Sequence, residues 1–276
     1  MHYERSEFYD PNLIVHSVAD KLKECNKKNE TIDYVTFVPD GEPTLDLNLG
    51  KEIAKVKKLG VPVALITNSS LMDNASLHKE LMQLDWISLK IDSLTEETWR
   101  KIDRPHKRIN FTKMLQGIIR FANNFKGKLT TETMLISGYN DSDKELELIS
   151  NFLEKLEPQI SYISIPTRPP AEKHALPANE MTLAKAYSIF AGKIPQVEHL
   201  IGYEGNEFGC SGDAYQDILS ITAVHPMRKD AVEELLQNNQ ADKDVINKLI
   251  NEGLILATEY HGHTYYVRKF REHQMG

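Results

Sequence analysis

The chain has 276 residues, a formal net charge of −7, 41% hydrophobic and 26% charged residues, and two cysteines. This composition is typical of a folded globular protein with one large domain or two domains, and it excludes global disorder and a broad nucleic-acid-binding surface. Because no apolar run approaches the roughly 18 residues of a membrane span and the N-terminus lacks the apolar core of a signal peptide, we expect a cytoplasmic protein.

The first two thirds of the chain alternate between helical and extended patterns. Helical spacing is expected over residues 11–27, 49–59, 77–84, 110–125, 142–156 and 180–190. Short β-branched or aromatic runs, typical of buried strands, occupy residues 33–40, 61–70, 86–92, 128–136, 162–166 and 197–202. This alternation predicts an α/β fold with a parallel sheet, and the lack of GxGxxG after the first strand favours a partial barrel over a dinucleotide-binding open sheet. Catalytic groups of such folds lie at the carboxyl ends of the strands.

Residues 216–276 have a different pattern and are predicted to form a small second domain after a barrel domain over residues 1–215. We expect, in order, a short extended segment, two helices and a β-hairpin, at residues 220–224, 226–236, 242–253 and 254–270. This order predicts a winged-helix-like module.

The strongest local signal follows the first predicted strand, in the sequence VPDGEPTL, which contains Asp40. Gly41 permits a positive φ and Pro43 fixes the chain after Glu42, so a carboxylate and backbone groups are held at the mouth of a site. A carboxylate there suits an ammonium group on a ligand. The alternative is a turn with a solvated glutamate.

The second strand ends in Thr67 and Asn68. An asparagine offers a donor and an acceptor, which suits a ribose, a carboxylate or an amide. For the two serines that follow, capping of the next helix is the preferred interpretation.

The third and fourth strands carry polar residues at corresponding positions. Strand alternation places Ser88, Lys90 and Asp92 on one side of the third strand, and Glu132 occupies a similar position on the fourth. A lysine within a buried strand is costly unless it contacts a ligand, forms a Schiff base or is ion-paired, so a structural pair of Lys90 with Asp92 or Glu132 is the alternative. The repeated pattern predicts a polar ligand cavity.

Two further clusters are candidates for substrate contacts. Arg104 and His106 follow the third strand, and Arg168 follows the fifth. An arginine at a strand end suits a carboxylate or phosphate, and a proline-stiffened surface loop is the competing explanation. The paired imidazoles of His261 and His263 would need further ligands to bind a metal, so a solvated hairpin is preferred and no metal site is predicted.

The order and spacing of GEP, ITNSS, SLKID and TETMLISGYND resemble the strand-end motifs of the radical S-adenosylmethionine (radical SAM) superfamily. The sequences TFVPDGEPTLDLNLG, IDRPH, IPTRPPAEK and IGYEGNEF resemble a subgroup of iron–sulfur oxidoreductases related to the wyosine-base tRNA-modifying synthases. The resemblance covers about residues 8–271.

This resemblance implies a partial (β/α)₆ TIM-like barrel, in which a CxxxCxxC loop holds a [4Fe–4S] cluster that chelates S-adenosylmethionine. Reductive cleavage then gives a 5′-deoxyadenosyl radical that abstracts hydrogen from a substrate. The resemblance also implies S-adenosylmethionine contacts at Asp40, Gly41, Glu42, Pro43, Thr67, Asn68, Ser88, Lys90, Asp92 and Glu132. The implied partners are a small molecule or tRNA as substrate and an electron donor, with no membrane and no DNA.

The chain departs from the family pattern because it contains no CxxxCxxC, and Cys25 and Cys210 do not stand before the GEP strand in the required place. We therefore expect a barrel that lacks its first strand, through truncation or through evolutionary loss. We also expect a chain that does not hold the cluster in the family manner and is inactive alone.

Two other functions remain open from the sequence. A Schiff-base lyase of the aldolase type would use Lys90 as the amine and Glu42 or Glu132 as the proton shuttle. A non-enzymatic RNA- or partner-binding protein would use the winged helix. From residue 225 onward seven lysines and arginines stand against eight acidic residues, 7 − 8 = −1, so the charge needed for DNA binding is absent.

Overall fold

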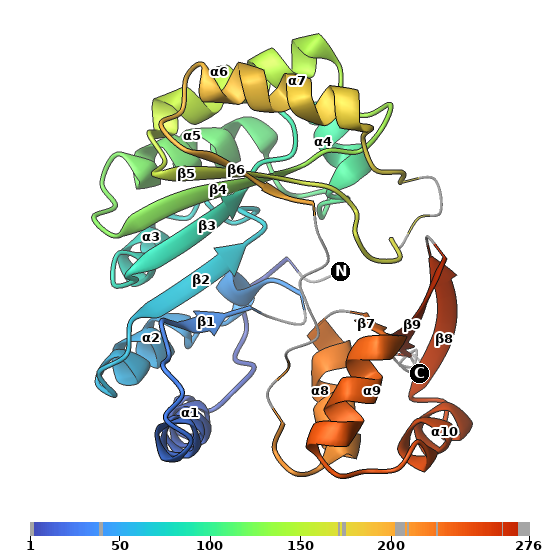
Figure 1. Ribbon diagram of the computed structural model, residues 1–276. Helices are drawn as coiled ribbons and strands as arrows, with labels where there is room; N and C mark the ends of the chain where they lie inside the picture. Colours follow the sequence, from blue (N-terminus) through green and yellow to red (C-terminus); the bar gives the residue numbers. More distant parts are fainter. Residues whose placement is uncertain are drawn as a thin grey trace. The chain divides into compact units, whose positions relative to one another are not determined.

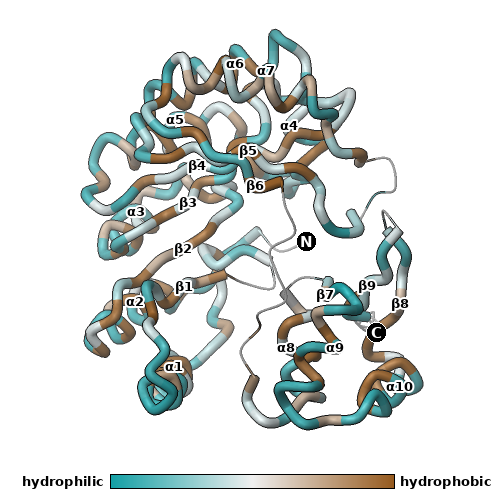
Figure 2. The backbone as a smooth tube through the Cα atoms, viewed as in Figure 1, coloured by the Kyte–Doolittle hydropathy of each residue, from teal (hydrophilic) through white to brown (hydrophobic). Residues whose placement is uncertain are grey.

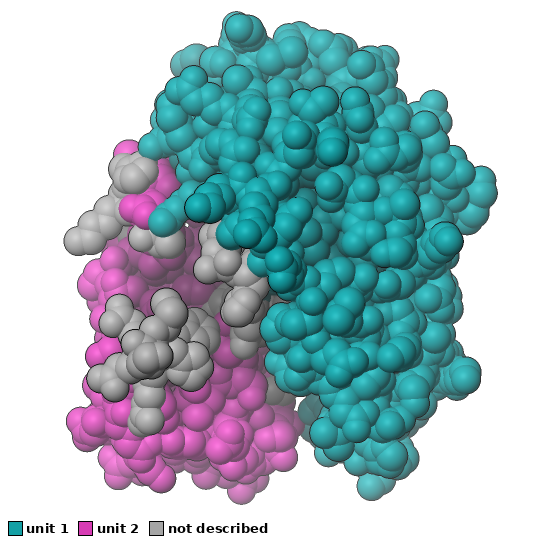
Figure 3. Space-filling view, turned by 180° about the vertical axis from the view of Figure 1, so that it is seen from behind, with its two compact units in different colours: residues 1–165, 177–201 teal, residues 166–176, 202–276 magenta. Residues whose placement is uncertain are grey.

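The computed structural model of the chain describes residues 3–38, 41–170, 172, 175–201, 208, 210–224, 226–260 and 262–269. The chain divides into two compact units, coloured separately in Figure 3: Met1–Ile165 with Pro177–Ile201, and Pro166–Leu176 with Gly202–Gly276. The division that the sequence predicts after residue 215 falls at the start of a helix, α8 (Ala214–Val224), inside the second unit.

The first unit is built on a parallel six-stranded sheet with the strands in sequence order, β1-β2-β3-β4-β5-β6. The strands are β1 (Val35–Phe37), β2 (Val63–Thr67), β3 (Trp86–Lys90), β4 (Lys128–Met134), β5 (Ile160–Ser164) and β6 (Val197–Leu200). The helices are α1 (Pro11–Lys27), the 3₁₀ turn η1 (Pro43–Leu45), α2 (Leu49–Lys57), α3 (Ala75–Leu81), α4 (Glu96–Ile102), α5 (Phe111–Ala122), α6 (Asp143–Leu156) and α7 (Glu180–Ala191). Helices α2, α3, α5 and α6 lie on the outside of the curved sheet (Figure 1). The predicted α/β fold is confirmed, and its parallel sheet is consistent with a partial TIM-like barrel.

Strand alternation separates an apolar face of the sheet from a polar one. Leu65, Ile87 and Leu89 are fully buried in the core under the helices, and burying a side chain of this size stabilises the fold by roughly 1.5–3 kcal/mol. The opposite face carries Lys90 and Glu132, and we call it the inner face. Figure 2 shows hydrophobic residues along the central strands of the sheet and a largely hydrophilic α1.

The N-terminal end of α6 fixes the loop after β3. Ser142 caps the helix by accepting a hydrogen bond from the Glu145 N–H. In a capping box the Glu145 side chain would return to the cap residue. Here its carboxylate instead accepts hydrogen bonds from the hydroxyls of Ser93 and Thr95, which follow β3. The loop that follows Lys90 is therefore held by a buried carboxylate.

The second unit contains three helices and a three-stranded antiparallel sheet in the order β7-β9-β8. Its elements are α8, β7 (Met227–Arg228), α9 (Lys229–Asn238), α10 (Asp244–Asn251), β8 (Ile255–Tyr260) and β9 (His263–Arg268). The hairpin predicted over residues 254–270 is confirmed by the pairing of β8 with β9, where Gly262 has a φ of 77°. His261 lies outside the described residues.

Two sequence predictions of secondary structure are wrong. Residues 220–224 are not extended but form the last turns of α8, because Ile218 and Ala214 place a buried stripe on a helix and the Thr222 hydroxyl donates to the Ile218 carbonyl. Helix α4 was not predicted, although Trp99 anchors it in the core. Among the described residues, no helix is long and apolar enough to cross a membrane.

Candidate functional site

One row of polar side chains crosses four neighbouring strands on the inner face. The register pairs Lys90 of β3 with Glu132 of β4. Glu132 is paired in turn with Tyr162 of β5, which is paired with Glu198 of β6. Paired residues of parallel strands point to the same face, so these four side chains form one continuous polar row. Lys90 and Glu132 are predicted from the sequence, whereas Tyr162 and Glu198 are not.

Lys90 lies between two carboxylates. Its Nζ is 3.1 Å from Asp92 Oδ2 and 3.9 Å from Glu132 Oε1. Asp92 Oδ1 accepts the Met134 N–H at 2.7 Å, and Glu132 Oε1 accepts the Ser164 hydroxyl at 2.8 Å. Burial alone would lower the pKa of Lys90, but the neighbouring carboxylates outweigh it and raise that pKa. Lys90 is therefore a fixed cation, held by partners that are themselves anchored.

Asp103, at the end of α4, is a third acidic residue at this position. Burial and the negative charge of Asp92 raise the pKa of its carboxyl well above the usual value, and the charge of Lys90 opposes this only in part. Asp103 belongs to the IDRPH motif, which was the available signal, but only the arginine and histidine of that motif are predicted from the sequence as site residues. The interactions of Asp103 with Asp92 and Lys90 connect the end of α4 to the end of β3.

Hydrogen bonds to the Glu42 carboxylate connect the GEP turn to the end of β2. This carboxylate accepts hydrogen bonds from the Thr44 N–H at 3.1 Å, the Thr44 hydroxyl at 2.6 Å, the Thr67 hydroxyl at 2.5 Å and the Asn68 N–H at 2.7 Å. Burial raises the pKa of Glu42, and these four donors oppose that rise. Gly41 has a φ of 132°, and Pro43 opens the turn η1. The turn is thus built around the Glu42 carboxylate, which accepts its hydrogen bonds from groups of the same chain.

Four further predicted contacts are Thr67, Asn68, Ser88 and Asp40. Thr67 is buried and donates its hydroxyl to Glu42, while the Asn68 Oδ1 accepts the Ser70 N–H at 2.9 Å. Ser88 is buried on the inner face two residues before Lys90. Asp40 lies outside the described residues.

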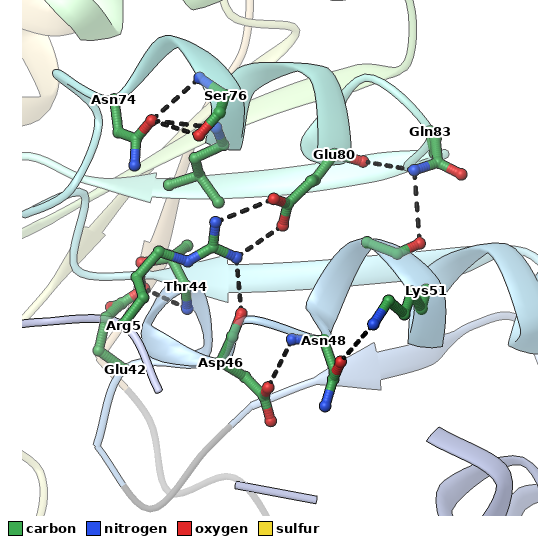
Figure 4. Close-up of polar contacts among 12 residues, drawn as sticks. Arg5, Glu42, Thr44, Asp46, Asn48, Lys51, Asn74, Ser76, Glu80 and Gln83 are labelled. Atoms are coloured by element: carbon green, nitrogen blue, oxygen red, sulfur yellow. Dashed lines mark hydrogen bonds and ion pairs between the residues drawn. The ribbon is translucent and has the colours of Figure 1, made fainter. Parts of the chain in front are cut away.

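The N-terminal segment crosses the same edge and is tied to it by Arg5. The Arg5 guanidinium donates to both oxygens of Glu80, at 2.9 and 2.6 Å, and to the Asp46 carbonyl at 2.6 Å (Figure 4). Tyr3 stacks on His106 with ring centroids 5.1 Å apart. The predicted substrate residue His106 is thus in contact with the N-terminal segment.

The two predicted arginines have different locations. Arg104 lies in the first unit with a φ of 48°, directly after Asp103. Arg168 belongs to the second unit, where the neighbouring carbonyls of Pro166 and Thr167 accept the hydroxyls of Tyr260 and Tyr265, each at 3.2 Å. The contact of Arg168 with the substrate stays a prediction.

The sequence matches the family profile of the radical SAM superfamily over residues 2–148. The chain belongs to this superfamily. It is 41% identical over 270 residues to the UPF0026 protein MJ1312 of Methanocaldococcus jannaschii, covering 97% of this chain and 84% of that protein. An S-adenosylmethionine-dependent nucleotide dehydratase of Lacinutrix mariniflava is 41% identical over 91 residues, which are 32% of this chain and 19% of that protein.

The fold is shared with a solved structure of TYW1 with a lysine–pyruvate adduct bound. The TM-score is 0.52 at 16% identity, over 67% of this chain and 64% of that one. The match to the family profile over residues 2–148 confirms the resemblance to the radical SAM superfamily. Members of the superfamily use S-adenosylmethionine and a [4Fe–4S] cluster.

The cysteines of this chain do not fit that cluster. The sequence contains two, of which Cys25 is buried in α1 and Cys210 belongs to the second unit. Burial also raises the pKa of the Cys25 thiol, which disfavours the thiolate that a metal requires. Among the described residues, no three histidine, cysteine or acidic side chains are placed to hold a metal ion. We therefore derive no reaction step through the cluster.

Proposed function

We propose that this chain binds S-adenosylmethionine on the inner face, at the carboxyl ends of β1 to β4. The observation that carries the proposal is the anchored Lys90–Asp92–Glu132 group, which stands at the strand ends of a radical SAM fold. Parallel α/β proteins bind their ligands at this end of the sheet.

The charges of this group suit the parts of S-adenosylmethionine. A fixed ammonium at Lys90 suits the carboxylate of the methionine moiety, and the acceptors Asp92 and Glu132 suit ribose hydroxyls. Ser88 adds a hydroxyl on the same face of β3.

We assign different roles to the residues of the GEP turn. Glu42 acts as a positioning residue, since its carboxylate is occupied by four donors of its own chain. The backbone of Gly41 and Pro43 and the side chain of Asn68 are the groups offered to the methionine ammonium. Asp40, Thr67, Arg104 and His106 complete the proposed contacts at this edge.

Radical chemistry on a small molecule or a tRNA is the reaction class that superfamily membership supports. That chemistry also needs the cluster and an electron donor, and the two cysteines of the sequence do not supply the cluster site. We therefore propose ligand binding for this chain, and hydrogen abstraction only for a form that is provided with the cluster.

A Schiff-base lyase using Lys90 is the less favoured function. A lysine–pyruvate adduct is present in the TYW1 structure that shares the fold. In this chain, however, neighbouring carboxylates raise the pKa of Lys90, whereas an amine nucleophile requires a lowered pKa.

For the second unit we propose a winged-helix-like module, because its helices α8–α10 are followed by the hairpin β8–β9. The formal charge of −1 over residues 225–276 favours a protein or RNA partner over DNA. Salt-dependent binding of tRNA to the whole chain in a gel-shift assay would support RNA, and no binding at low salt would exclude it.

Isothermal titration with S-adenosylmethionine tests the main proposal. We expect micromolar to submillimolar binding by the wild type, at least a tenfold loss in Lys90→Met, and a smaller loss in Glu132→Gln. Lys101→Met is the matched control, because Lys101 is an exposed lysine on α4 paired with Glu97. Circular dichroism verifies that each variant is folded. Absence of binding by a folded wild type, or equal losses in Lys90→Met and Lys101→Met, would overturn the proposal.

A further inference from the structure

Two carboxyl oxygens beside Lys90 are buried without a hydrogen-bond donor. They are Asp92 Oδ2, which follows β3, and Asp103 Oδ2, at the end of α4. Six buried side-chain nitrogen or oxygen atoms in the described part of the chain have no hydrogen-bond partner, and two of the six belong to these aspartates. Because a buried acceptor without a donor is costly, the pair requires a hydrogen atom that two ionised carboxylates do not have.

The two side chains are in contact. The Asp103 carboxyl forms a hydrogen bond with the Asp92 side chain. An ionised carboxylate can only accept, so a hydrogen bond between two carboxyl groups needs one proton. A single O–H on one aspartate, donating to the other, provides both buried oxygens with a partner.

The surroundings of the pair indicate which aspartate carries the proton. Asp92 Oδ1 accepts the Met134 N–H at 2.7 Å, and Asp92 Oδ2 is 3.1 Å from Lys90 Nζ. An N–H donor and an ammonium group are the partners of an ionised carboxylate. Asp103 instead caps the carboxyl end of α4, where the helix dipole disfavours a negative charge. Asp92 is therefore the anion and Asp103 the neutral acid.

The proton changes the charge that surrounds Lys90. Lys90 interacts with both aspartates, Glu132 Oε1 is 3.9 Å from its Nζ, and Arg104, next to Asp103, is exposed. With the proton, Lys90 and the two aspartates sum to 1 − 1 = 0, and without it they sum to 1 − 2 = −1. A second ionised aspartate beside Lys90 would repel a ligand carboxylate that approaches the ammonium group.

We propose that Asp92 and Asp103 share one proton in the folded protein, and that the neutral Asp103 is a positioning residue that keeps Lys90 able to bind an anionic group of the ligand. Asp103 holds Asp92 by donating a hydrogen bond and adds no charge to the site. The role toward the ligand rests on the proposed binding of S-adenosylmethionine, whereas the shared proton is a property of the chain alone.

The pH dependence of unfolding tests the shared proton without a ligand. Burial and the charge of Asp92 raise the pKa of Asp103 in the folded protein, whereas an unfolded chain ionises this carboxyl above about pH 4. The stability that the proton adds is full below the unfolded-state pKa and is lost as the pH rises through the folded-state pKa. Asp103→Asn keeps a donor for Asp92 and does not titrate.

Urea denaturation of both proteins gives the ratio of the wild-type unfolding equilibrium constant to that of Asp103→Asn. We expect this ratio to rise by up to about tenfold per pH unit above about pH 4, and to level off at the folded-state pKa of Asp103. Asp33→Asn is the control, because it makes the same substitution at an exposed aspartate before β1. The corresponding ratio for Asp33→Asn should change less than about twofold.

Titration with S-adenosylmethionine tests the positioning role, and comparison of variants at the same pH cancels the titration of the ligand itself. Below the pH at which the unfolding ratio levels off, the wild type and Asp103→Asn should bind within about twofold of each other. Above that pH the wild type should bind about threefold to tenfold more weakly, because Asp103 is then ionised. Asp103→Ala, which has no donor for Asp92, should bind more weakly than Asp103→Asn at every pH.

The outcomes separate this inference from the proposed function. An unfolding ratio that does not change with pH would show that Asp103 is ionised in the folded protein, and it would overturn the whole inference. A ratio that does change, with equal affinities of the wild type and Asp103→Asn above the levelling pH, would overturn the positioning role. If the folded wild type binds no S-adenosylmethionine, the proposed function fails and the positioning role fails with it, while the unfolding ratio still decides whether the proton is shared.

Discussion

Two parts of the same sheet edge use glutamate in opposite ways. At the GEP turn, Glu42 is buried and takes four hydrogen bonds from its own chain. On the inner face, Glu132 and Glu198 are partly exposed and keep hydrogen-bonding capacity. The comparison teaches that the glutamate of the GEP motif is used to build its own turn, while the glutamates on the neighbouring strands keep unused acceptor capacity. The following changes test that distinction.

The largest effect is expected from Glu42→Ala. The substitution leaves two backbone N–H groups and two hydroxyls without their acceptor, and we expect the free energy of unfolding to fall by about 3–5 kcal/mol. Urea denaturation provides the measurement, with Glu154→Ala as the exposed control. A loss below 1 kcal/mol would show that Glu42 is not the residue that builds the turn.

Lys90→Met is expected to lower the free energy of unfolding by about 2–4 kcal/mol at pH 7, because it leaves the buried Asp92 carboxylate without its ion-pair partner. Lowering the pH should recover part of this loss, since protonation removes the unpaired charge. Urea denaturation at pH 7 and pH 4.5 tests the expectation. An equal loss at both values would attribute the effect to packing rather than charge.

Glu52 on α2 is a third case, buried like Glu42 but without a donor on its Oε1 in the described structure. Burial and the charge of Asp46 raise its pKa from 4.5 to about 7. A raised folded-state pKa means that the stability of the wild type is full below pH 4.5 and falls as the pH rises through 7. Glu52→Gln removes the ionisation. The free energy of unfolding of this variant should therefore rise relative to that of the wild type by about 2 kcal/mol between pH 5 and pH 8. A constant difference between the two unfolding curves would contradict this.

Arg5→Ala tests how strongly the N-terminal segment is held at the GEP edge. The loss of the paired hydrogen bonds to Glu80 should lower the free energy of unfolding by about 1–2 kcal/mol. It should also speed hydrogen exchange of the Leu47 amide, which donates to the Ser6 carbonyl. Unchanged exchange at Leu47 would show that the segment is held by its other contacts.

The smallest effect on stability is expected from Glu198→Gln. Because its carboxylate is partly exposed and keeps Gln196 as a neighbour in either form, the free energy of unfolding should change by less than about 0.5 kcal/mol. Thermal unfolding of the variant beside Glu154→Gln gives the comparison. A loss comparable to that of Glu42→Ala would assign Glu198 a structural role instead.

Much of the fold could be predicted from local patterns. The six strands of the sheet were found because β-branched runs alternate with helical spacing, and the pairing of Lys90 with Glu132 was foreseen as an alternative. Asp103 and Glu198 were missed for a common reason, since each is a single acidic residue whose neighbours come from other strands or loops. Residues 220–224 were misread because a short β-branched run fits either a strand or a buried helix face.

The sequence by itself determined the parallel α/β architecture, the superfamily resemblance, and the shortage of cysteines that separates this chain from the family's cluster site. These properties depend on spacing and composition, which are local. Only the tertiary structure decided that the Glu42 carboxylate is used internally, that Arg168 belongs to the second unit, and that the polar row extends to Tyr162 and Glu198. Hydrogen-bond partners and register bring together residues far apart in the chain, so no local pattern specifies them.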